Sequence, residues 1–422
     1  MIDPEKTTQE QPAHFYDRPG VELDTIPVGG GVRIGLERVV NEAIGIGGVY
    51  GAWGDSYDNE ALPGFAEHLL EGPLRPEERM NLAELGFVSR HHTPDLTPEE
   101  HVQLEVEVGA RFLREAALTC GWLPSEVDAI LIGSSGPTSD DYLNKIGSAA
   151  GIPESALKVS VHKACDSSTS GLHLALNPAL PENEQLETNL AERLAGKKVL
   201  VGGIEGLSRL LRQAHDRYAV QLFGNAAGII GLIPGQSMKF IAGKSFEAFD
   251  EVGTLQFHMF YPHKRRTTDG TTNVEVVQVS DNLIRVAGLM HEPENGDAIA
   301  MAGPMGMVKL FVRNGVQVVR AAYDAYQERL AELGLSGKPL VVAIVHHANY
   351  KINKLKEKQL QGMGIVLSMP WLLSDFGNVS AASNMVALLR QLPRLNPGDH
   401  ILIDGFGAGT YYDTLAVEMG AG

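Results

Sequence analysis

Helix-type and strand-type patterns of apolar and polar residues alternate along most of this 422-residue chain. Apolar positions at helical spacing predict helices over residues 101–122, 142–150, 315–335 and 378–392. Short continuous apolar runs predict buried strands over residues 127–135, 197–207, 339–349 and 399–409. Residues 219–235 have the pattern of a β-hairpin. Strands that alternate with helices indicate an α/β fold with mostly parallel or mixed sheets and helix layers.

The order of elements in the second half of the chain matches the order in the first half. Strand 339–349 corresponds to strand 127–135, and strand 399–409 corresponds to strand 197–207. An internal duplication is the simplest account of this order. We therefore expect three parts: an N-terminal extension over residues 1–43, an N-terminal half over residues 44–235 and a C-terminal half over residues 236–422.

Composition narrows the class of protein. Apolar residues make up 44% of the chain and charged residues 21%, which is typical of a globular protein. The net charge of −17 argues against a general nucleic-acid binder. Cys120 and Cys165 form neither a CxxC pair nor a disulfide framework, so we expect a reducing, cytoplasmic location. The first residues lack the pattern of a signal peptide, and no apolar run is long enough for a bilayer, so we expect no membrane association.

The stretch VSVHKACDSSTSGLHLAL, residues 159–176, places Cys165 where a strand gives way to a helix. The Ser and Thr residues after Asp166 are typical of a helix start. Backbone N–H groups and the positive end of a helix dipole would both favour a thiolate at Cys165. A free cysteine is more often a small buried apolar residue, and this stretch alone shows no partner base. Both interpretations therefore stay open at this point.

Motifs in the second half of the chain supply partners for the cysteine. HHAN, residues 346–349, ends a buried strand, GNVSAAS, residues 377–383, begins a helix, and GFGAG, residues 405–409, forms a glycine turn. Taken alone, His346 could be an ordinary polar residue at a strand end, and Asn378 could be a helix N-cap. In this order and after ACDSS, the motifs resemble the ketoacyl synthase III family of the thiolase fold. The resemblance covers residues 44–420, with insertions around 177–197 and 250–298.

The resemblance implies a thiolase fold, with duplicated β/α halves and two central mixed five-stranded sheets in a layered αβαβα arrangement. It implies a catalytic set of Cys165, His346 and Asn378, in which Cys165 carries an acyl group. The implied oxyanion hole consists of backbone N–H groups, which belong to Cys165, Gly407, Ala408 and Gly409. The family implies thioesters of CoA or acyl-carrier protein as substrates, no metal and no redox cofactor, and a homodimer.

Further residues match substrate-binding positions of the family more loosely: Asp140, Arg209, Lys309, Asn349 and Lys351. The loop at residues 136–145 matches the one that reaches into the partner subunit's pocket in relatives. The basic run HKRR contains Lys264, Arg265 and Arg266, which are candidates for docking CoA phosphates or an acidic carrier protein. The alternative is that this run is a solvated basic face.

The resemblance favours a 3-oxoacyl-[acyl-carrier-protein] synthase III-like condensing enzyme that performs a decarboxylative Claisen condensation. Residues 74–90 lack the Trp that often stacks on the CoA adenine in relatives, and the loop at 136–145 is polar. These departures favour a role in specialised lipid or polyketide metabolism over fatty-acid initiation. Two alternatives stay open: an acyltransferase of the same fold that acts on an alcohol, amine or thiol, and a non-catalytic subunit that binds acyl chains or a partner.

Overall fold

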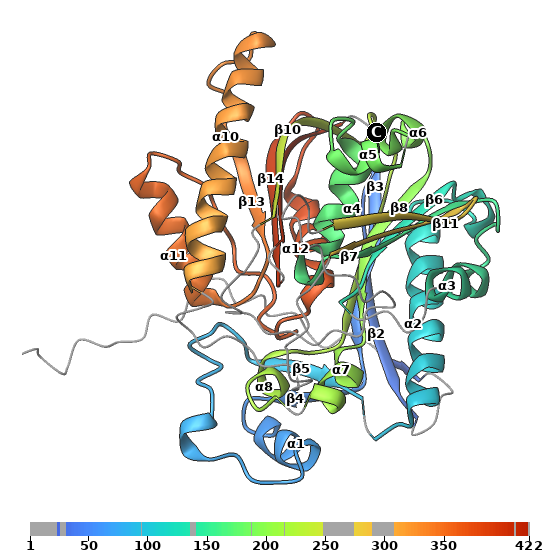
Figure 1. The fold of residues 1–422 in the computed structure, drawn as a ribbon, viewed down its shortest axis with the longest axis vertical. Helices are drawn as coiled ribbons and strands as arrows, with labels where there is room; N and C mark the ends of the chain where they lie inside the picture. The colour runs from blue at the N-terminus through green and yellow to red at the C-terminus, as the bar shows by residue number, and fades with distance from the viewer. Residues whose placement is uncertain are drawn as a thin grey trace, which may run out of the picture.

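The computed structural model describes residues 23–25, 31–93, 95–135, 141–186, 188–214, 216–247, 274–288, 308–408 and 411–420. These residues form two main sheets with helices between them and on their outer faces (Figure 1). The layers run in the order helix, sheet, helix, sheet, helix, as the predicted arrangement requires.

The first sheet has nine strands among the described residues. Their spatial order is β1 (Leu23–Thr25), β2 (Arg33–Asn41), β3 (Ile46–Trp53), β9 (Ala226–Leu232), β8 (Val199–Glu205), β6 (Ala129–Gly133), β7 (Leu157–His162), β12 (Leu283–Gly288) and β11 (Val274–Ser280). Strands β8, β6, β7 and β12 are parallel, whereas β3, β9 and β11 pair antiparallel with their neighbours. The parallel strands therefore end at the same edge of the sheet.

The second sheet has four strands within the described ranges, in the order β10 (Met238–Glu247), β15 (Tyr411–Met419), β14 (His400–Gly407) and β13 (Leu340–Val345). Strands β13 and β14 are parallel, and β15 is antiparallel to both of its neighbours. A separate small sheet pairs β4 (Asp55–Asp58) with β5 (Ser89–His92).

Two helices fill the space between the main sheets. They are α4 (Ser167–Leu176) and α12 (Ser383–Gln391), which contact strands of both sheets (Figure 1). Leu172 and Leu388 from these helices are fully buried in one core cluster with Val201 of the first sheet and Ile403 of the second. Burial of each such side chain contributes about 1.5–3 kcal/mol, so this layer holds the two halves together.

The outer helices cover the remaining faces. Helix α2 (Pro98–Thr119) packs on β3 and β9 and against α3 (Tyr142–Ala150), while α10 (Gly315–Glu332) packs on β10 and β15 beside α11 (Tyr350–Gly362). Helix α2 begins three residues before the predicted start at residue 101, because a capping box forms there: Thr97 Oγ1 accepts a hydrogen bond from Glu100 N–H at 3.2 Å, and Glu100 Oε2 accepts one from Thr97 N–H at 2.8 Å. No helix in the described ranges is long and apolar enough to cross a membrane.

Shorter elements connect these layers. The short α-helices are α1 (Leu62–Leu69), α5 (Pro181–Gln185), α6 (Leu190–Leu194), α7 (Leu207–Ala214) and α8 (Ala219–Leu222). The 3₁₀ turns are η1 (Pro76–Glu78), η2 (Pro124–Glu126), η3 (Ala164–Asp166), η5 (Ser380–Ala382) and η6 (Leu392–Arg394), and η4 (Val308–Asn314) is a π-helix.

Three details differ from the sequence predictions. The strand numbers are not five in each sheet, because β1 and β2 extend the first sheet on one side and β12 and β11 on the other. Strand β2 lies within the expected extension 1–43, so the ordered sheet begins earlier than predicted. Residues 219–235 form α8 and β9 and not a hairpin, because β9 pairs with β3 and β8, both of which lie outside this stretch. The two domain boundaries remain predictions.

Candidate active site

The ends of five strands bring the predicted motifs to one region. In the first sheet, the strands β6, β7 and β8 are parallel. Strand β6 ends just before Ser135, β7 ends just before Cys165, and β8 ends at Glu205. In the second sheet, the parallel strands β13 and β14 end next to His346 and at Gly407, and His346 N–H donates to the Asp404 carbonyl at 2.9 Å. Polar residues that follow parallel strands therefore meet at the facing edges of both sheets.

A strained turn presents Cys165. Ala164 has a φ of +50°, in the left-handed region that non-glycine residues rarely occupy. Ser167 fixes the turn, since its Oγ accepts from Lys163 N–H at 2.8 Å and donates to the Ala164 carbonyl at 2.7 Å. Helix α4 begins at this serine, two residues after Cys165. Such strain persists only where surrounding contacts impose it, and here those contacts fix the position of the thiol.

The glycine turn of the second half packs directly on this turn. A Cβ atom on Gly407 would lie 2.3 Å from the Lys163 carbonyl oxygen and 3.0 Å from the Asp166 nitrogen. Only glycine permits this approach, because both contacts are to backbone atoms. Gly407 and Ala408 are both buried. The two segments that were predicted to form the oxyanion hole, Cys165 and the Gly407–Ala408 turn, are therefore neighbours.

The Asn378 motif supplies a hydroxyl that touches the sulfur. Ser380 Oγ donates a hydrogen bond to Cys165 Sγ at 3.2 Å. Asn378 Oδ1 accepts from Ser380 N–H at 2.9 Å, and Ser380 has a φ of +43°. Among the described residues no partner contacts Nδ2 of Asn378, so its amide can donate to a bound group. Cys165 and Asn378 thus share one site, with Ser380 between them.

Burial controls the chemistry of the thiol. Burial, together with the negative charges of Glu205 and Asp166, raises the pKa of Cys165 to about 12, although the hydrogen bond from Ser380 opposes the rise. This direction is opposite to the one expected for a thiolate stabilised by the helix N-terminus. The cost of removing the thiolate from water exceeds the stabilisation from helix α4.

Charged groups lie beneath the nucleophile turn. Lys163 Nζ contacts Glu182 Oε1 at 2.8 Å and Asp413 Oδ2 at 3.5 Å, and His173 Nδ1 contacts Asp413 Oδ1 at 2.6 Å. Burial and the neighbouring Asp413 charge raise the pKa of Asp166 well above its ordinary value. The ion pairs of Lys163 therefore fix the start of the nucleophile turn.

The two adjacent histidines differ in their surroundings. The His346 ring lies edge-on to Phe406, with 5.0 Å between ring centroids, and Phe406 directly precedes Gly407. His347 points elsewhere, since its Nε2 accepts from Leu372 N–H at 2.9 Å and its ring packs on Trp371. Burial lowers the pKa of His346 to about 3, so its imidazole is neutral near pH 7.

Comparison with known proteins shows which family the chain resembles. Residues 330–419 match the sequence model described as 3-oxoacyl-[acyl-carrier-protein (ACP)] synthase III C terminal. The β-ketoacyl-[acyl-carrier-protein] synthase III of Vesicomyosocius okutanii is 27% identical over 228 residues, which cover 53% of this chain and 59% of that protein. The protein of the same name from Gloeobacter violaceus is 25% identical over 329 residues, which cover 74% of this chain and 83% of that protein. The chain is similar to ketoacyl synthase III proteins, and the family model matches its C-terminal part.

The solved structures support the same relationship. The 3-oxoacyl-[acyl-carrier-protein] synthase III of Aquifex aeolicus superposes with a TM-score of 0.58 at 16% identity, covering 92% of this chain and 100% of that one. The predicted thiolase fold is confirmed, and so is the predicted resemblance to ketoacyl synthase III. The relatives are named β-ketoacyl- or 3-oxoacyl-[acyl-carrier-protein] synthase III, which agrees with the predicted class of enzyme.

Other positions matched to ketoacyl synthase III have structural contacts. Arg209 forms a partly buried ion pair with Glu105, with Nε 2.7 Å from Oε1. Asn349 is the N-cap of α11, where its Oδ1 accepts from Ile352 N–H at 2.9 Å. Lys351 contacts Glu84 on the surface. The structure does not bring these side chains to Cys165, and their substrate-binding roles remain predictions.

Several predicted site residues lie outside the described residues. They are Asp140, Gly409, Lys264, Arg265 and Arg266, together with the side chain of Lys309. Their proposed roles therefore stay predictions.

Sequence reasoning missed two buried residues near the nucleophile, Ser135 and Glu205. Ser135 Oγ donates to Glu205 Oε1 at 2.6 Å, and Ser135 Oγ also contacts Ser380 Oγ. A signal was present: IGSS and GGIEG place polar residues at the carboxyl ends of two apolar strands, and parallel strands bring such ends together.

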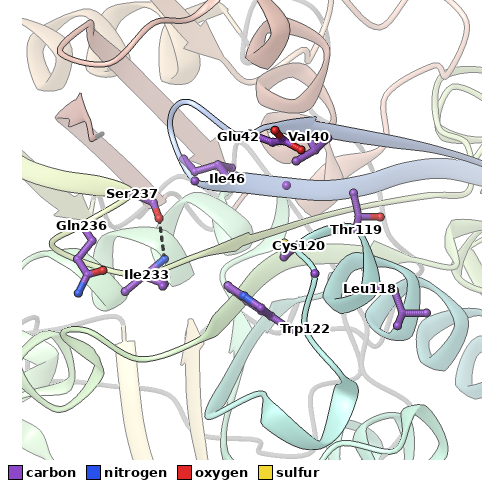
Figure 2. Close-up of a pocket in the computed structure, with 13 residues that line it drawn as sticks. Val40, Glu42, Ile46, Leu118, Thr119, Cys120, Trp122, Ile233, Gln236 and Ser237 are labelled. Carbon is purple, nitrogen blue, oxygen red and sulfur yellow. Dashed lines mark hydrogen bonds between the residues drawn. The ribbon is translucent and has the colours of Figure 1, made fainter. Parts of the chain in front are cut away.

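The second cysteine lies at the other end of the first sheet. Cys120 follows α2 and lines a surface hollow of about 470 Å³ with residues of the β2–β3 and β9–β10 connections (Figure 2). The end of β9 lies here beside the start of β8, with Leu232 paired to Val199. This edge is opposite the carboxyl ends that carry Cys165. Burial raises the pKa of Cys120 to about 12, and nothing here links it to the Cys165 site.

Proposed function

We propose that this protein is a condensing enzyme that loads an acyl group onto Cys165 and extends it by decarboxylative Claisen condensation. One observation carries the proposal: Ser380 of the Asn378 turn contacts the Cys165 sulfur while Gly407 packs on the Cys165 turn. Motifs from both halves of the chain thus surround a single thiol. A scaffold that only bound a partner would have no need for this arrangement.

In the loading step, the Cys165 sulfur attacks the carbonyl carbon of an acyl thioester. The new C–S bond forms as the bond to the carrier sulfur breaks, and the carrier leaves as a thiol after it takes up a proton. The tetrahedral oxyanion would accept hydrogen bonds from backbone N–H groups of Cys165 and the Gly407–Ala408 turn. Ala408 supplies the same backbone N–H donor that a glycine would supply at this position.

In the extension step, a malonyl-type thioester loses CO₂, and the electrons of the broken C–C bond form an enolate. The neutral His346 ring and the amide of Asn378 would donate hydrogen bonds to the enolate oxygen. The enolate carbon then attacks the acyl carbonyl, and the Cys165 sulfur leaves. Because charge is stabilised only by hydrogen-bond donors, we expect neither a metal nor a redox cofactor to be required.

The donor would be a thioester of CoA or of an acyl-carrier protein, and the product would belong to specialised lipid or polyketide metabolism. We propose a homodimer as the working form. Departures from the usual CoA-binding pattern, such as the missing Trp in residues 74–90, support a specialised role.

Intact-mass measurement after incubation with a panel of acyl-CoA and acyl-carrier-protein thioesters tests the proposal. At least one donor should add its acyl mass to the protein, and peptide mapping should place the group on Cys165. The adduct should disappear in Cys165→Ala and persist in Cys120→Ala. An adduct on Cys120, or one that survives Cys165→Ala, would rule out Cys165 as the nucleophile.

A further inference from the structure

A continuous row of polar groups runs from the Cys165 sulfur into the interior of the first half. Ser380 Oγ lies 3.2 Å from the sulfur, Ser135 Oγ contacts Ser380 Oγ, and Glu205 Oε1 lies 2.6 Å from Ser135 Oγ. Glu205, Ser135 and Ser380 are all buried. The row therefore connects a nucleophile to a carboxylate that cannot itself touch a substrate.

The backbone holds the carboxylate end of this row in place. Glu205 Oε1 accepts from Ser135 N–H at 2.9 Å and from Ala381 N–H at 3.0 Å. Gly203 allows Ala381 to come this close, since a Cβ there would lie 2.4 Å from the Ala381 carbonyl oxygen. The turn that carries Ser380 is thus fixed to the end of β8, and the alignment of the row does not depend on flexible side chains.

The number of protons matches the number of links. Three contacts join sulfur, Ser380, Ser135 and Glu205, and three protons are available from one thiol and two hydroxyls when Glu205 is ionised. Every link can therefore hold one proton pointing towards Glu205. If each proton moves one link along, Glu205 becomes neutral, the sulfur becomes a thiolate, and Ser380 donates its hydroxyl proton to that thiolate.

The thiol of Cys165 is a weaker acid than the carboxyl of Glu205, so the proton leaves the sulfur only as the new bond to sulfur forms and makes the thiol more acidic. Burial raises the pKa of Glu205 to about 7, while hydrogen bonds from Ser135 and Ala381 oppose the rise. The remaining charged or titratable groups that interact with Glu205 are Cys165 itself, Tyr142 of α3 and Arg209 of α7. Arg209 is paired with Glu105 of α2, so its charge is largely neutralised. Glu205 is thus ionised above neutrality and can accept a proton.

We propose that Glu205 receives the Cys165 proton through Ser380 and Ser135 as the sulfur attacks an electrophile. The proposal rests on the proposed function for its physiological electrophile, an acyl thioester. The C–S bond to Cys165 forms, the bond to the carrier sulfur breaks, and the thiol proton passes along the row to Glu205. The departing carrier thiolate is a stronger base than a carboxylate and recovers that proton through the same row, so no proton is gained or lost overall.

The test uses alkylation of Cys165 by iodoacetamide, which needs no acyl donor. The sulfur displaces iodide, and the thiol proton goes to Glu205 and then to the buffer. The rate at the Cys165 peptide, followed by mass spectrometry, should rise through a pH of about 7 in the wild type and then level off. General-base assistance typically contributes about 10²–10⁴-fold, so Glu205→Gln should lower the rate at least about 10²-fold near neutrality.

The pH profile separates proton transfer from a merely structural role. Glu205→Gln keeps an oxygen acceptor for both backbone N–H groups but cannot take a proton. Its rate should climb steadily with pH and meet the wild-type rate at high pH, because removal of the Glu205 charge also eases ionisation of the thiol. A structural defect would lower the rate at every pH.

Two further variants and one control complete the test. Ser380→Ala and Ser135→Ala each break the row and should reproduce the Glu205→Gln profile, and adding Glu205→Gln to either should lower the rate no further. Because each serine variant breaks the row at a different place, the test still gives a result if one of the two misfolds. Glu78→Gln removes another buried carboxylate, which contacts Arg75 and Arg217 and none of the row. It should keep the wild-type profile.

The outcomes distinguish this inference from the proposed function. A Glu205→Gln profile that matches the wild type refutes the proton row, even if acyl thioesters load Cys165. A Glu205→Gln profile without the wild-type rise near neutral pH supports the proton row, even if no acyl thioester loads Cys165 and the proposed function fails.

Discussion

Gly407→Ala should disable the site without removing any hydrogen-bond donor. The added Cβ would lie 2.3 Å from the Lys163 carbonyl oxygen, whereas carbon and oxygen atoms in contact lie about 3.3–3.6 Å apart. The two turns must therefore separate by about 1 Å. A displacement of that size at a reacting group costs about 10²-fold in rate. The overpacked contact should also cost about 1–3 kcal/mol of stability.

Acyl loading measured by intact mass over time, together with thermal unfolding, checks this prediction. Gly362→Ala is the matched control, because no atom lies within 4 Å of its added Cβ. The control should load at the wild-type rate and unfold at the same or a higher temperature, since Ala is favoured over Gly in a helix by about 0.5–1 kcal/mol. Loading by Gly407→Ala within about threefold of the wild type would show that the close contact of the two turns does not position Cys165.

Three further predictions address the remaining parts of the account. His346→Ala should still load an acyl group but should release CO₂ from a malonyl thioester about 10²–10³-fold more slowly, whereas His347→Ala should stay close to the wild type; reversed behaviour would mean that the strand register is wrong. Alanine at residues 264–266 should raise KM at low salt with little change in kcat, and a KM that is equal at all ionic strengths would indicate a solvated face. Light scattering at micromolar concentration should give the mass of a dimer, and a monomeric mass would contradict the proposed homodimer.

Local sequence patterns were sufficient to predict those helices and strands whose own spacing of apolar residues determines which positions are buried. The helix expected at 101–122 is α2, which lies three residues earlier, at Pro98–Thr119. The strands expected at 127–135 and 339–349 are β6 and β13. Each has a continuous apolar run because helices cover both faces of its sheet.

The pairing of strands from different parts of the chain could not be predicted from these local patterns. Strand β9 was predicted as part of a hairpin, but it pairs with β3, which lies far away in the sequence, and with β8, from which helices α7 and α8 separate it. Strand β12 joins the first sheet beside β7, although it lies in the predicted second half. Alternation of apolar and polar residues predicts that a strand exists, but it does not say which strand pairs with it.

The electrostatics of the site depended on the same long-range contacts. The expected thiolate at Cys165 rested on its helix alone, whereas burial beneath residues of the second half raises the pKa of the thiol. The order of the Cys, His and Asn motifs did predict that Cys165 and the Asn378 turn meet. It did not reveal Glu205 and Ser135, because their roles follow from which strand ends are adjacent.

The central claim, a decarboxylative condensation on Cys165, can be tested with a single product measurement. Acyl-loaded protein is mixed with malonyl-type thioesters that carry a label in the carboxyl carbon, and labelled CO₂ and the thioester product are measured together. The account predicts equal amounts of CO₂ and of a β-ketoacyl thioester longer than the loaded acyl group, both absent in Cys165→Ala. Transfer of the acyl group to an acceptor without CO₂ release from any malonyl donor would contradict it and would favour a simple acyltransferase.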